Sequence, residues 1–295
     1  MKKVCLRPAT NPADPRRAAF SRVELLVVMS VVALLAGLVL ADVGGSGRGA
    51  RRLLCLENLR RLAGASALYA TDNQDRLPHC TWATVGGSSG PNGWCYAAYL
   101  PDKKWIPGLA GFANNERQLP FLRAGQLWPY VREERAFLCP EDSALSQSSQ
   151  ASLWRARPQK VISYFMNAAV ISFGRLPYST EASAGQSANT QPLSRFAPNA
   201  VLFWEGDESV PESFNNGAGS PSEGISGRHG PTVSRPTTAA AGLNGGQMGC
   251  FDGSALFVTK SEYYEESGGA LAPSRLPKAL PNRLWCDPDS PTGGY

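Results

Sequence analysis

The chain contains two histidines, and one of them, His229, lies where it could take part in chemistry. A histidine held by a carboxylate can act as a general base when a nucleophile lies within its reach. Asp252 is the candidate partner, with Arg228 and Glu205 nearby if the strands pair as their patterns indicate. Because no GxSxG or comparable nucleophile frame is present, we favour a His229–Asp252 hydrogen bond that fixes a loop to a hairpin. A ligand site and a hydrolase are the alternatives.

Cysteines are the second group of reactive side chains. Cys5 lies close to the N-terminus, and the other six follow a long apolar segment. None of them has the CxxC spacing of a zinc or redox site, so we expect no metal site. Their even number suits disulfides in an exported domain, although six cysteines allow many pairings. We expect Cys55 to pair with Cys139, and Cys80 with Cys95 across a glycine-rich loop.

Two short groups of oxygen-bearing side chains could hold calcium. They are Asp72, Asn73 and Asp75, and Glu205, Asp207 and Glu208. Neither group has the ligand spacing or the sharp glycine turn of an EF-hand loop. We therefore expect no cofactor and read the groups as a helix C-cap and a solvated loop, with calcium as the alternative.

Aromatic side chains gather in a stretch rich in glycine and proline. They are Trp82, Trp94, Tyr96, Tyr99, Trp105 and Phe112. If they were exposed together, they would offer a platform to a carbohydrate or a protein partner. We expect packing in the core or against loops, and a monomeric, membrane-anchored binding module is our second functional hypothesis.

The elements that must position these residues form an α+β domain over 50–272. Residues 50–70 have helical periodicity, with a stripe of Leu56, Leu59, Ala63 and Ala67. Asp72-Asn73 is expected to end this helix. We predict that it packs on an antiparallel sheet with long loops.

Short apolar or alternating runs predict the strands of that sheet. They cover 161–169, 200–205 and 249–258, the last with Asp252-Gly253 as a two-residue hairpin turn. Polar segments at 183–191 and 215–226 predict surface loops. The proline-rich tail, 273–295, is expected to wrap the domain.

The most apolar part of the chain precedes this domain. Residues 25–41 carry no charge, and a helix of this length at about 1.5 Å per residue approaches the ~30 Å of a bilayer core. We predict a transmembrane helix over 20–43, preceded by a basic leader over 1–19 and followed by a glycine-rich hinge over 44–49. The alternatives are an ordinary anchor with an interfacial glutamate and a secretory signal cut after Ala41.

This N-terminal pattern resembles the prepilin signal of type IV pilins and type II secretion pseudopilins. It consists of basic residues, Ala18-Ala19, Phe20, a glutamate at Glu24 and the apolar helix. In that family a prepilin peptidase cuts before the phenylalanine and methylates the new amine, which implies a cut between Ala19 and Phe20. Most members have glycine where this chain has Ala19. The resemblance also implies that Glu24 pairs with the amine of Phe20, on its own or a neighbouring subunit, and sets the assembly register.

Landmarks along the domain resemble one branch of pseudopilin-like proteins, large members typical of planctomycete and verrucomicrobial bacteria. In the family's order they are CLENL at 55–59, YATDN at 69–73, GQLWPYV at 125–131, FLCPED at 137–142, SYFMN at 163–167, VLFWE at 201–205, RHG at 228–230 and FDGS at 251–254. The last two form a C-terminal motif of His229 with Asp252 and Gly253. The gap between them is longer than is usual in the family, which implies an insertion such as 231–243.

The resemblance implies a structural subunit and no enzyme. It would be a single-pass inner-membrane protein with its C-terminal domain in the periplasm or at the cell surface. It would assemble into, or cap, a type II secretion or type IV pilus-like filament. The implied partners are the prepilin peptidase, other pseudopilins or further copies of the chain, the assembly machinery and the membrane.

Composition agrees with such a chain. Its 295 residues suit one domain plus an anchor, and 43% hydrophobic residues suffice for a core. Thirty glycines and 23 prolines favour loops over long helices. Most of the formal net charge of +5 lies in the leader, so charge gives no support for nucleic-acid binding.

Overall fold

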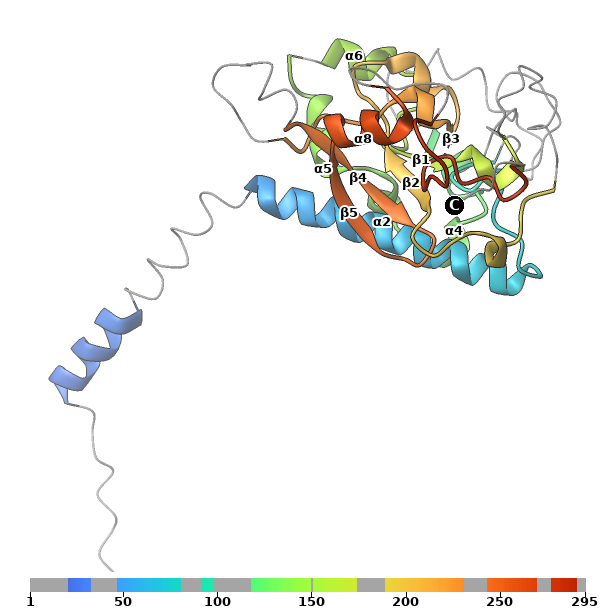
Figure 1. The fold of residues 1–295 in the computed structure, drawn as a ribbon. Helices are drawn as coiled ribbons and strands as arrows, with labels where there is room; N and C mark the ends of the chain where they lie inside the picture. The colour runs from blue at the N-terminus through green and yellow to red at the C-terminus, as the bar shows by residue number, and fades with distance from the viewer. Residues whose placement is uncertain are drawn as a thin grey trace, which may run out of the picture. The chain divides into compact units, whose positions relative to one another are not determined.

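The computed structural model describes residues 21–32, 47–80, 92–97, 118–149, 151–173, 189–230, 243–269 and 277–290. The chain divides into two compact units, Met1–Gly47 and Arg48–Tyr295. The first unit contains a helix over 22–32, and the second is a mixed α/β domain with a five-stranded sheet (Figure 1). The predicted α+β class is therefore confirmed for the second unit.

The helix over 22–32 begins at a capping box. The N–H of Ser21 donates to Glu24 Oε2 at 2.8 Å, and the N–H of Glu24 donates to Ser21 Oγ at 3.1 Å. Each large apolar side chain from Val23 to Val32 is at least 50% exposed. Among the described residues, no helix has both the length and the apolar character needed to cross a membrane. Residues 33–46 of the predicted span and hinge lie outside the described residues, as do Ala19 and Phe20.

The second unit is built around α2 (Gly47–Asp72), a helix of 26 residues. Cys55, Leu59 and Leu62 are completely buried, at the three- and four-residue spacing of one helix face. Leu56, which we expected in this stripe, is only partly buried. The helix was predicted, but its buried face is turned by about one residue from the expected stripe.

The ends of α2 test the predicted boundaries. Gly47 to Gly49 are helical, so the last part of the predicted hinge, 44–49, is wrong. N–H groups of a first helical turn have no intrahelical partner in any case, and glycine costs less there than in a helix interior. The C-terminal end at Asp72 is as predicted, and the Asn73 side chain donates to the carbonyl of Tyr69 at 2.7 Å.

The sheet has the strand order β3-β1-β2-β4-β5. Its strands are β1 (Tyr164–Asn167), β2 (Val201–Glu205), β3 (Ala218–Gly219), β4 (Gly245–Cys250) and β5 (Ala255–Thr259). The pairs β1–β2, β2–β4 and β4–β5 are antiparallel, as predicted, whereas β1–β3 is parallel. The prediction of a purely antiparallel sheet is therefore wrong. After β2 the chain crosses over β1 and forms β3 along the outer edge of β1, parallel to it.

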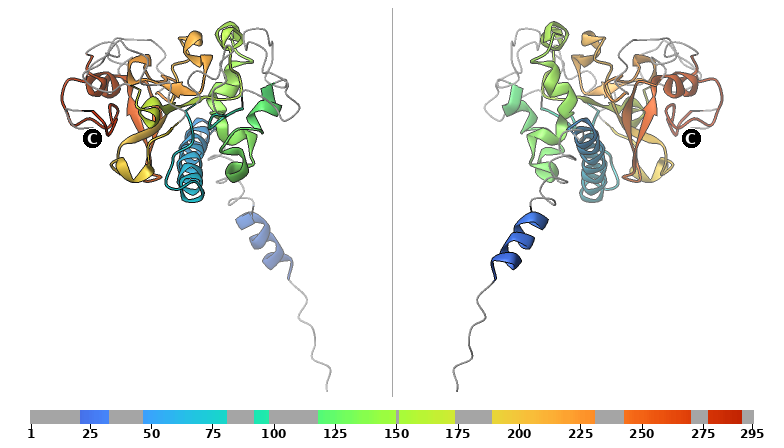
Figure 2. Two further views of the ribbon diagram at one scale, coloured as in Figure 1. Left: turned by 90° about the vertical axis from the view of Figure 1, so that its right-hand side faces the viewer. Right: turned by 90° about the vertical axis from the view of Figure 1, so that its left-hand side faces the viewer.

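Both faces of the sheet are covered, because every residue of β1, β2 and β4 is buried. On one face, the Gln247 side chain of β4 donates to the carbonyl of Arg52 in α2 at 2.8 Å. At the other end of the hairpin, α8 (Lys260–Ser267) contacts β4 and β5. In Figure 2, α2 lies between the sheet and the green segment that contains residues 118–145.

That segment consists of short helical pieces. They are α3 (Leu119–Leu122), α4 (Trp128–Val131), a 3-10 helix (Glu134–Phe137) and α5 (Pro140–Leu145), and α6 (Ala151–Ala156) comes next among the helices described. A proline in the first turn starts α3, α4 and α5. The Asn58 side chain of α2 ties the segment down by donating to the carbonyls of Arg135 and Leu138, each at 3.1 Å.

Residues 215–226, predicted as a surface loop, are instead largely buried. They contain β3 and a 3-10 helix (Pro221–Glu223), and follow another 3-10 helix (Pro211–Asn215). The buried indole of Trp94 donates to the carbonyl of Gly217 at 2.8 Å, and that of Trp204 to the carbonyl of Gly224 at 3.1 Å. Buried indoles need acceptors, and this polar stretch supplies them from its backbone.

The predicted hairpin of β4 and β5 is confirmed, but its turn is longer than two residues. The N–H of Gly253 donates to the carbonyl of Cys250 at 3.1 Å, and Gly253 has a φ of 84°. The N–H of Cys250 donates to the carbonyl of Ser254 at 2.8 Å. These two hydrogen bonds and a left-handed glycine at the third position are the pattern of a common three-residue hairpin connection.

The described part of the tail, 277–290, contacts β1 and β2, and the predicted wrapping of the domain by the whole tail stays a prediction. The N–H of Val201 donates to the carbonyl of Arg283 at 2.9 Å. The Asn167 side chain donates to the carbonyls of Val201 and Leu284, each at 2.9 Å. Two further 3-10 helices, Ala168–Ile171 and Leu193–Arg195, complete the elements in this part of the domain.

Glu223 gives the domain a pH-dependent contribution to stability. Burial raises the pKa of Glu223 to about 7, although its carboxylate accepts a hydrogen bond from the N–H of Ser220. Unfolded Glu223 keeps the ordinary pKa of 4.5, so between about pH 4.5 and 7 the folded chain holds the proton more tightly. Stability therefore falls as pH rises through this window and is not regained above it.

We expect Glu223→Gln to remove that fall. The amide oxygen can still accept from Ser220, so the variant should match the parent chain at pH 4.5. At pH 8 it should be more stable by on the order of 1–2 kcal/mol, measured by urea unfolding. Glu262→Gln in the exposed capping box of α8 is the control. The backbone hydrogen bond from Thr259 lowers the pKa of Glu262, so this variant should lose stability at pH 8. Equal pH profiles for both variants would contradict the assignment.

Candidate functional site

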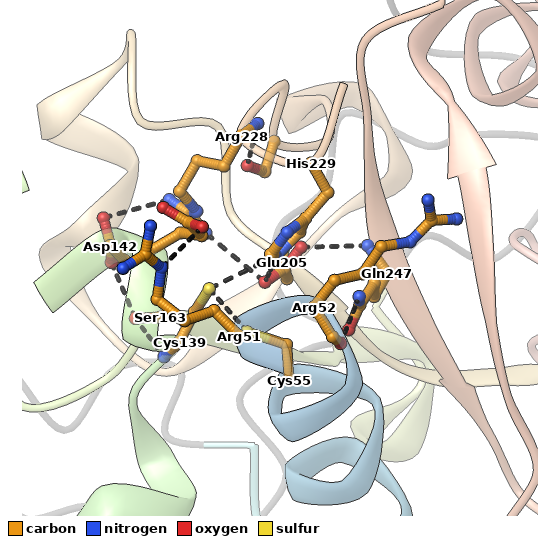
Figure 3. Close-up of polar contacts among 12 residues, drawn as sticks. Arg51, Arg52, Cys55, Cys139, Asp142, Ser163, Glu205, Arg228, His229 and Gln247 are labelled. Atoms are coloured by element: carbon orange, nitrogen blue, oxygen red, sulfur yellow. Dashed lines mark hydrogen bonds and ion pairs between the residues drawn. The ribbon is translucent and has the colours of Figure 1, made fainter. Parts of the chain in front are cut away.

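Cys55, Cys139, Glu205 and His229 form one group in the described part of the chain, which we call the Cys–His cluster. One potential ligand atom from each lies within 4.8 Å of the other three, and all four residues are buried. Cys139 Sγ is 2.7 Å from Cys55 Sγ and 3.3 Å from His229 Nε2. The same Nε2 is 3.0 Å from Glu205 Oε1. Figure 3 shows these side chains pointing toward one another from different elements.

Four separate segments supply the cluster. Cys55 lies on the buried face of α2, and Cys139 is the N-cap residue of α5. Glu205 ends β2, and His229 lies in the loop between β3 and β4. Because strand side chains alternate, Glu205 points to the face opposite its buried neighbour Trp204.

Backbone and side-chain hydrogen bonds hold the four residues in place. The N–H of Cys139 donates to Ser163 Oγ at 3.0 Å, and the N–H of His229 to the carbonyl of Gly245 at 3.1 Å. Glu205 Oε2 accepts from the N–H of Gln247 at 3.0 Å, which leaves Oε1 directed at His229. Cys139, His229 and Glu205 are therefore each fixed by a neighbour outside the cluster, whereas Cys55 is held by its position in α2.

A second buried group, the Asp142 network, adjoins the cluster. Asp142 accepts from Arg157 Nη1 and Nη2 at 2.6 and 2.8 Å, from Ser163 Oγ at 2.6 Å and from Arg228 Nη1 at 3.0 Å. The side chains of Asp142, Arg157 and Arg228 are 0, 1 and 3% exposed. Arg228 also lies 4.0 Å from Glu205, so it connects the network to the cluster.

Burial and charge act in opposite directions on the ionisable groups. Burial disfavours the charged carboxylates, yet Arg228 and Arg157 lower the pKa of Asp142, and His229 with Arg228 lowers the pKa of Glu205. Burial also disfavours an imidazolium, but hydrogen bonds with Cys139 and Glu205 raise the pKa of His229 to about 10. Burial raises the pKa of the Cys139 thiol well above its ordinary value. These directions favour charged Glu205 and His229 beside a neutral Cys139 thiol.

This arrangement differs from a nucleophile–base–acid relay. In such a relay, one ring nitrogen faces the nucleophile and the other faces the carboxylate. Here a single nitrogen, His229 Nε2, faces both Cys139 and Glu205. The geometry therefore fits a structural or ligand-holding role, two of the alternatives that the sequence left open.

The carboxylate partner of His229 is Glu205, and the predicted His229–Asp252 hydrogen bond is wrong. Asp252 is exposed in the turn between β4 and β5, where its Oδ1 accepts from the N–H of Ser254 at 2.8 Å. Gly253 provides the left-handed residue of that turn. The two parts of the C-terminal motif therefore lie in different places. His229 belongs to the cluster, whereas Asp252 and Gly253 lie in the hairpin turn.

The predicted cysteine pairs are placed as follows. Cys55 and Cys139 meet through their sulfur atoms inside the cluster, so the structure brings this pair together, and a covalent bond between them stays a prediction. Cys80 and Cys95 are both completely buried, and their pairing also stays a prediction.

Protein donors already contact the acidic groups that we considered for calcium. Asp72 accepts from the Tyr130 hydroxyl at 2.8 Å, and Asp75 from the Ser194 hydroxyl at 2.5 Å. Asp207 pairs with Lys260 at 2.8 Å, and Glu208 accepts from Ser226 Oγ at 2.7 Å. The remaining carboxylate, Glu205, belongs to the cluster.

Two of the aromatic residues weighed as a binding platform lie in the core. Trp94 is completely buried and stacks on Phe137 with ring centroids 5.9 Å apart. Tyr96 is 1% exposed, and its hydroxyl accepts from the Gln159 side chain at 2.7 Å. The core packing that we expected is confirmed for these two, and the other four aromatics lie outside the described residues.

Sequence reasoning missed the cluster as a unit. Its members are far apart in the chain: Cys139 lies 84 residues from Cys55 and 90 from His229. No local spacing of the kind that marks a zinc site could reveal it. The sequence did indicate two parts of it: the pairing of Cys55 with Cys139, and the carboxylate of Glu205 at the end of an apolar strand near His229.

Comparison of the chain with models of known families, with curated proteins and with solved structures found no match.

Proposed function

We propose that the chain is a pseudopilin-like structural subunit, cleaved before Phe20, methylated there and anchored in the inner membrane by the helix that begins at Arg22. Its second unit would face the periplasm or the cell surface. In this proposal the subunit assembles with copies of itself or with other pseudopilins into, or at the tip of, a filament of the type II secretion or type IV pilus kind.

The exposed apolar surface of the helix over 22–32 carries this proposal. Its large apolar side chains, from Val23 to Val32, are each at least 50% exposed and lie on all sides of the helix. A helix that is apolar all round is covered by lipid or by other helices. A filament of bundled subunits anchored in a membrane would supply both covers.

The state of Glu24 also bears on the proposal. In the unprocessed chain its carboxylate accepts from the N–H of Ser21. Cleavage before Phe20 would create a positive amine nearby, and a carboxylate at the edge of an apolar segment is stabilised by such a partner. Assembly would then use Glu24 only after processing.

The experiment determines the mature N-terminus of the chain and measures its assembly in the same host. We expect mass spectrometry of chain purified from host membranes to find an N-methylated Phe20. Glu24→Ala should be processed normally. It should lower the yield of cross-linked multimers at least about tenfold, because a loss of about 1.4 kcal/mol of binding free energy at each subunit contact weakens association tenfold.

Ser21→Ala is the matched control, since it removes the capping box and keeps the carboxylate. It should assemble like the parent chain. An N-terminus at Asp42 would indicate a secreted domain and overturn the proposal. An uncleaved chain that gives no cross-linked multimers would point to a monomeric anchored binding module. Full assembly of Glu24→Ala would contradict the role proposed for Glu24.

A further inference from the structure

The donor atoms of the Cys–His cluster form a ligand set. Two cysteine sulfurs, one imidazole nitrogen and one carboxylate oxygen lie within 4.8 Å of one another. Structural zinc sites use four such donors in a closed tetrahedron, with cysteine and histidine most often and carboxylates less often. Both the number and the softness of these donors suit Zn²⁺ better than calcium or magnesium, which prefer oxygen ligands.

Hydrogen bonds alone do not give every polar atom at the centre of the cluster a partner of its own. His229 Nε2 is 3.0 Å from Glu205 Oε1 and 3.3 Å from Cys139 Sγ, but it can carry only one proton. A cation between the four atoms would contact all of them at once. It would also compensate a buried carboxylate, Glu205, which is completely inaccessible to solvent.

Neighbouring groups already orient the donors, as they do around known metal sites. Gln247 holds the far oxygen of Glu205, and Ser163 holds the backbone of Cys139. Arg228, 4.0 Å from Glu205, supplies the positive charge that would balance an excess of anionic ligands. A cavity of about 260 Å³ lined by Arg52, His229 and Phe257, among others, gives an entry path.

From this geometry we propose that Cys55, Cys139, His229 and Glu205 bind one zinc-class divalent cation, which links α2, α5 and the sheet. The proposal does not depend on the function proposed above. On binding, two thiol protons and the Nε2 proton pass to water, leaving two thiolates, a neutral imidazole and a carboxylate around the ion.

The two sulfurs must separate for this. They are 2.7 Å apart, whereas a tetrahedron with zinc–sulfur bonds of about 2.3 Å sets them at about 3.8 Å. Side-chain rotation of one cysteine covers that difference. The competing outcome is a Cys55–Cys139 disulfide, which would use two of the four donors and leave Glu205 and His229 as a buried ion pair.

The test uses the full-length chain in detergent, first analysed for zinc as purified and then reduced, stripped by a chelator and titrated with Co²⁺. We expect about one zinc per chain as purified. Co²⁺ should give the absorption of tetrahedral cobalt with a thiolate charge-transfer band, and equimolar Zn²⁺ should displace it. His229→Gln should weaken cobalt binding by at least about tenfold to a hundredfold. Cys139→Ser should weaken the charge-transfer band, because Cys55 would be the only thiolate ligand left.

Cys250→Ser is the matched control, because Cys250 is a buried cysteine of β4 outside the cluster. It should bind cobalt like the parent chain. If Cys139→Ser fails to fold, His229→Gln and the thermal stability of the parent chain with and without Zn²⁺ decide the matter. Two results would overturn the proposal: a folded, reduced chain that takes up no cobalt, or metal-free chain from an exporting host in which peptides containing Cys55 and Cys139 are covalently joined.

Discussion

Asp142→Ala is expected to destabilise the domain by about 3–5 kcal/mol, a large part of the roughly 5–15 kcal/mol that stabilises a typical domain. The reason is the loss of a charge shared by two buried cations. Asp142 accepts two hydrogen bonds from Arg157 and one from Arg228, and the arginine side chains are 1 and 3% exposed. Without the carboxylate both guanidinium groups would stay buried with less compensation, or the surrounding segments would open to hydrate them.

The measurement is urea unfolding of the full-length chain, followed by tryptophan fluorescence. Glu134→Gln provides the control, because Glu134 forms an ion pair with Arg123 whose side chains are 32 and 53% exposed. Solvent-exposed pairs contribute about 0–1 kcal/mol, so this variant should unfold almost like the parent chain. A loss of similar size in both variants would mean that Asp142 is not the buried centre of charge described above.

The Asp142 network also shows where prediction from the sequence ends. Asp142 lies 15 residues from Arg157 and 86 from Arg228, in segments with no periodic pattern that links them. Periodicity reports which side of an element is buried, and it carries no information on which distant charges meet. The network and the Cys–His cluster therefore became visible only when α2, α5 and β2 were placed together.

The elements that were predicted well from the sequence are those with a strong local pattern. α2, β2 and the hairpin of β4 and β5 each combine an apolar pattern with a recognisable end, such as Asp72 or Gly253. Segment 215–226 was misjudged because its glycines, serines and asparagines are typical of loops. In the fold the same small residues lie beside Trp94 and Trp204, whose side chains need backbone acceptors.

The pairing of His229 with Glu205 and not with Asp252 has a similar cause. Glu205 ends a predicted strand and Asp252 lies in a predicted hairpin turn, and sequence cannot tell which end of a sheet a loop will reach. The register of β2 against β4 decides it: Trp204 lies opposite Met248, which brings the end of β2 near the start of β4. The loop with His229 is fixed there by Gly245.

Among the glycines that the structure describes, Gly245 is a position where a single methyl group is expected to do great harm. A Cβ at this residue would overlap the carbonyl oxygen of Val258 and lie 2.7 Å from the Cα of Thr259, so backbone would have to move. β4 pairs with β5 through this residue, opposite Thr259. We expect Gly245→Ala to cost about 3 kcal/mol or more, since neither strand can shift without losing hydrogen bonds.

Gly64→Ala is the same chemical change with the opposite expected sign. Gly64 is exposed in the interior of α2, and a Cβ there meets no atom within 4 Å. Alanine should therefore stabilise the helix by about 1 kcal/mol through its higher helix propensity. Urea unfolding of the two variants beside the parent chain measures both effects. If Gly245→Ala unfolded at the same urea concentration as the parent, the close approach of β4 to β5 would be incorrect. If Gly64→Ala were destabilising, the exposed face of α2 would contact something that the described residues do not include.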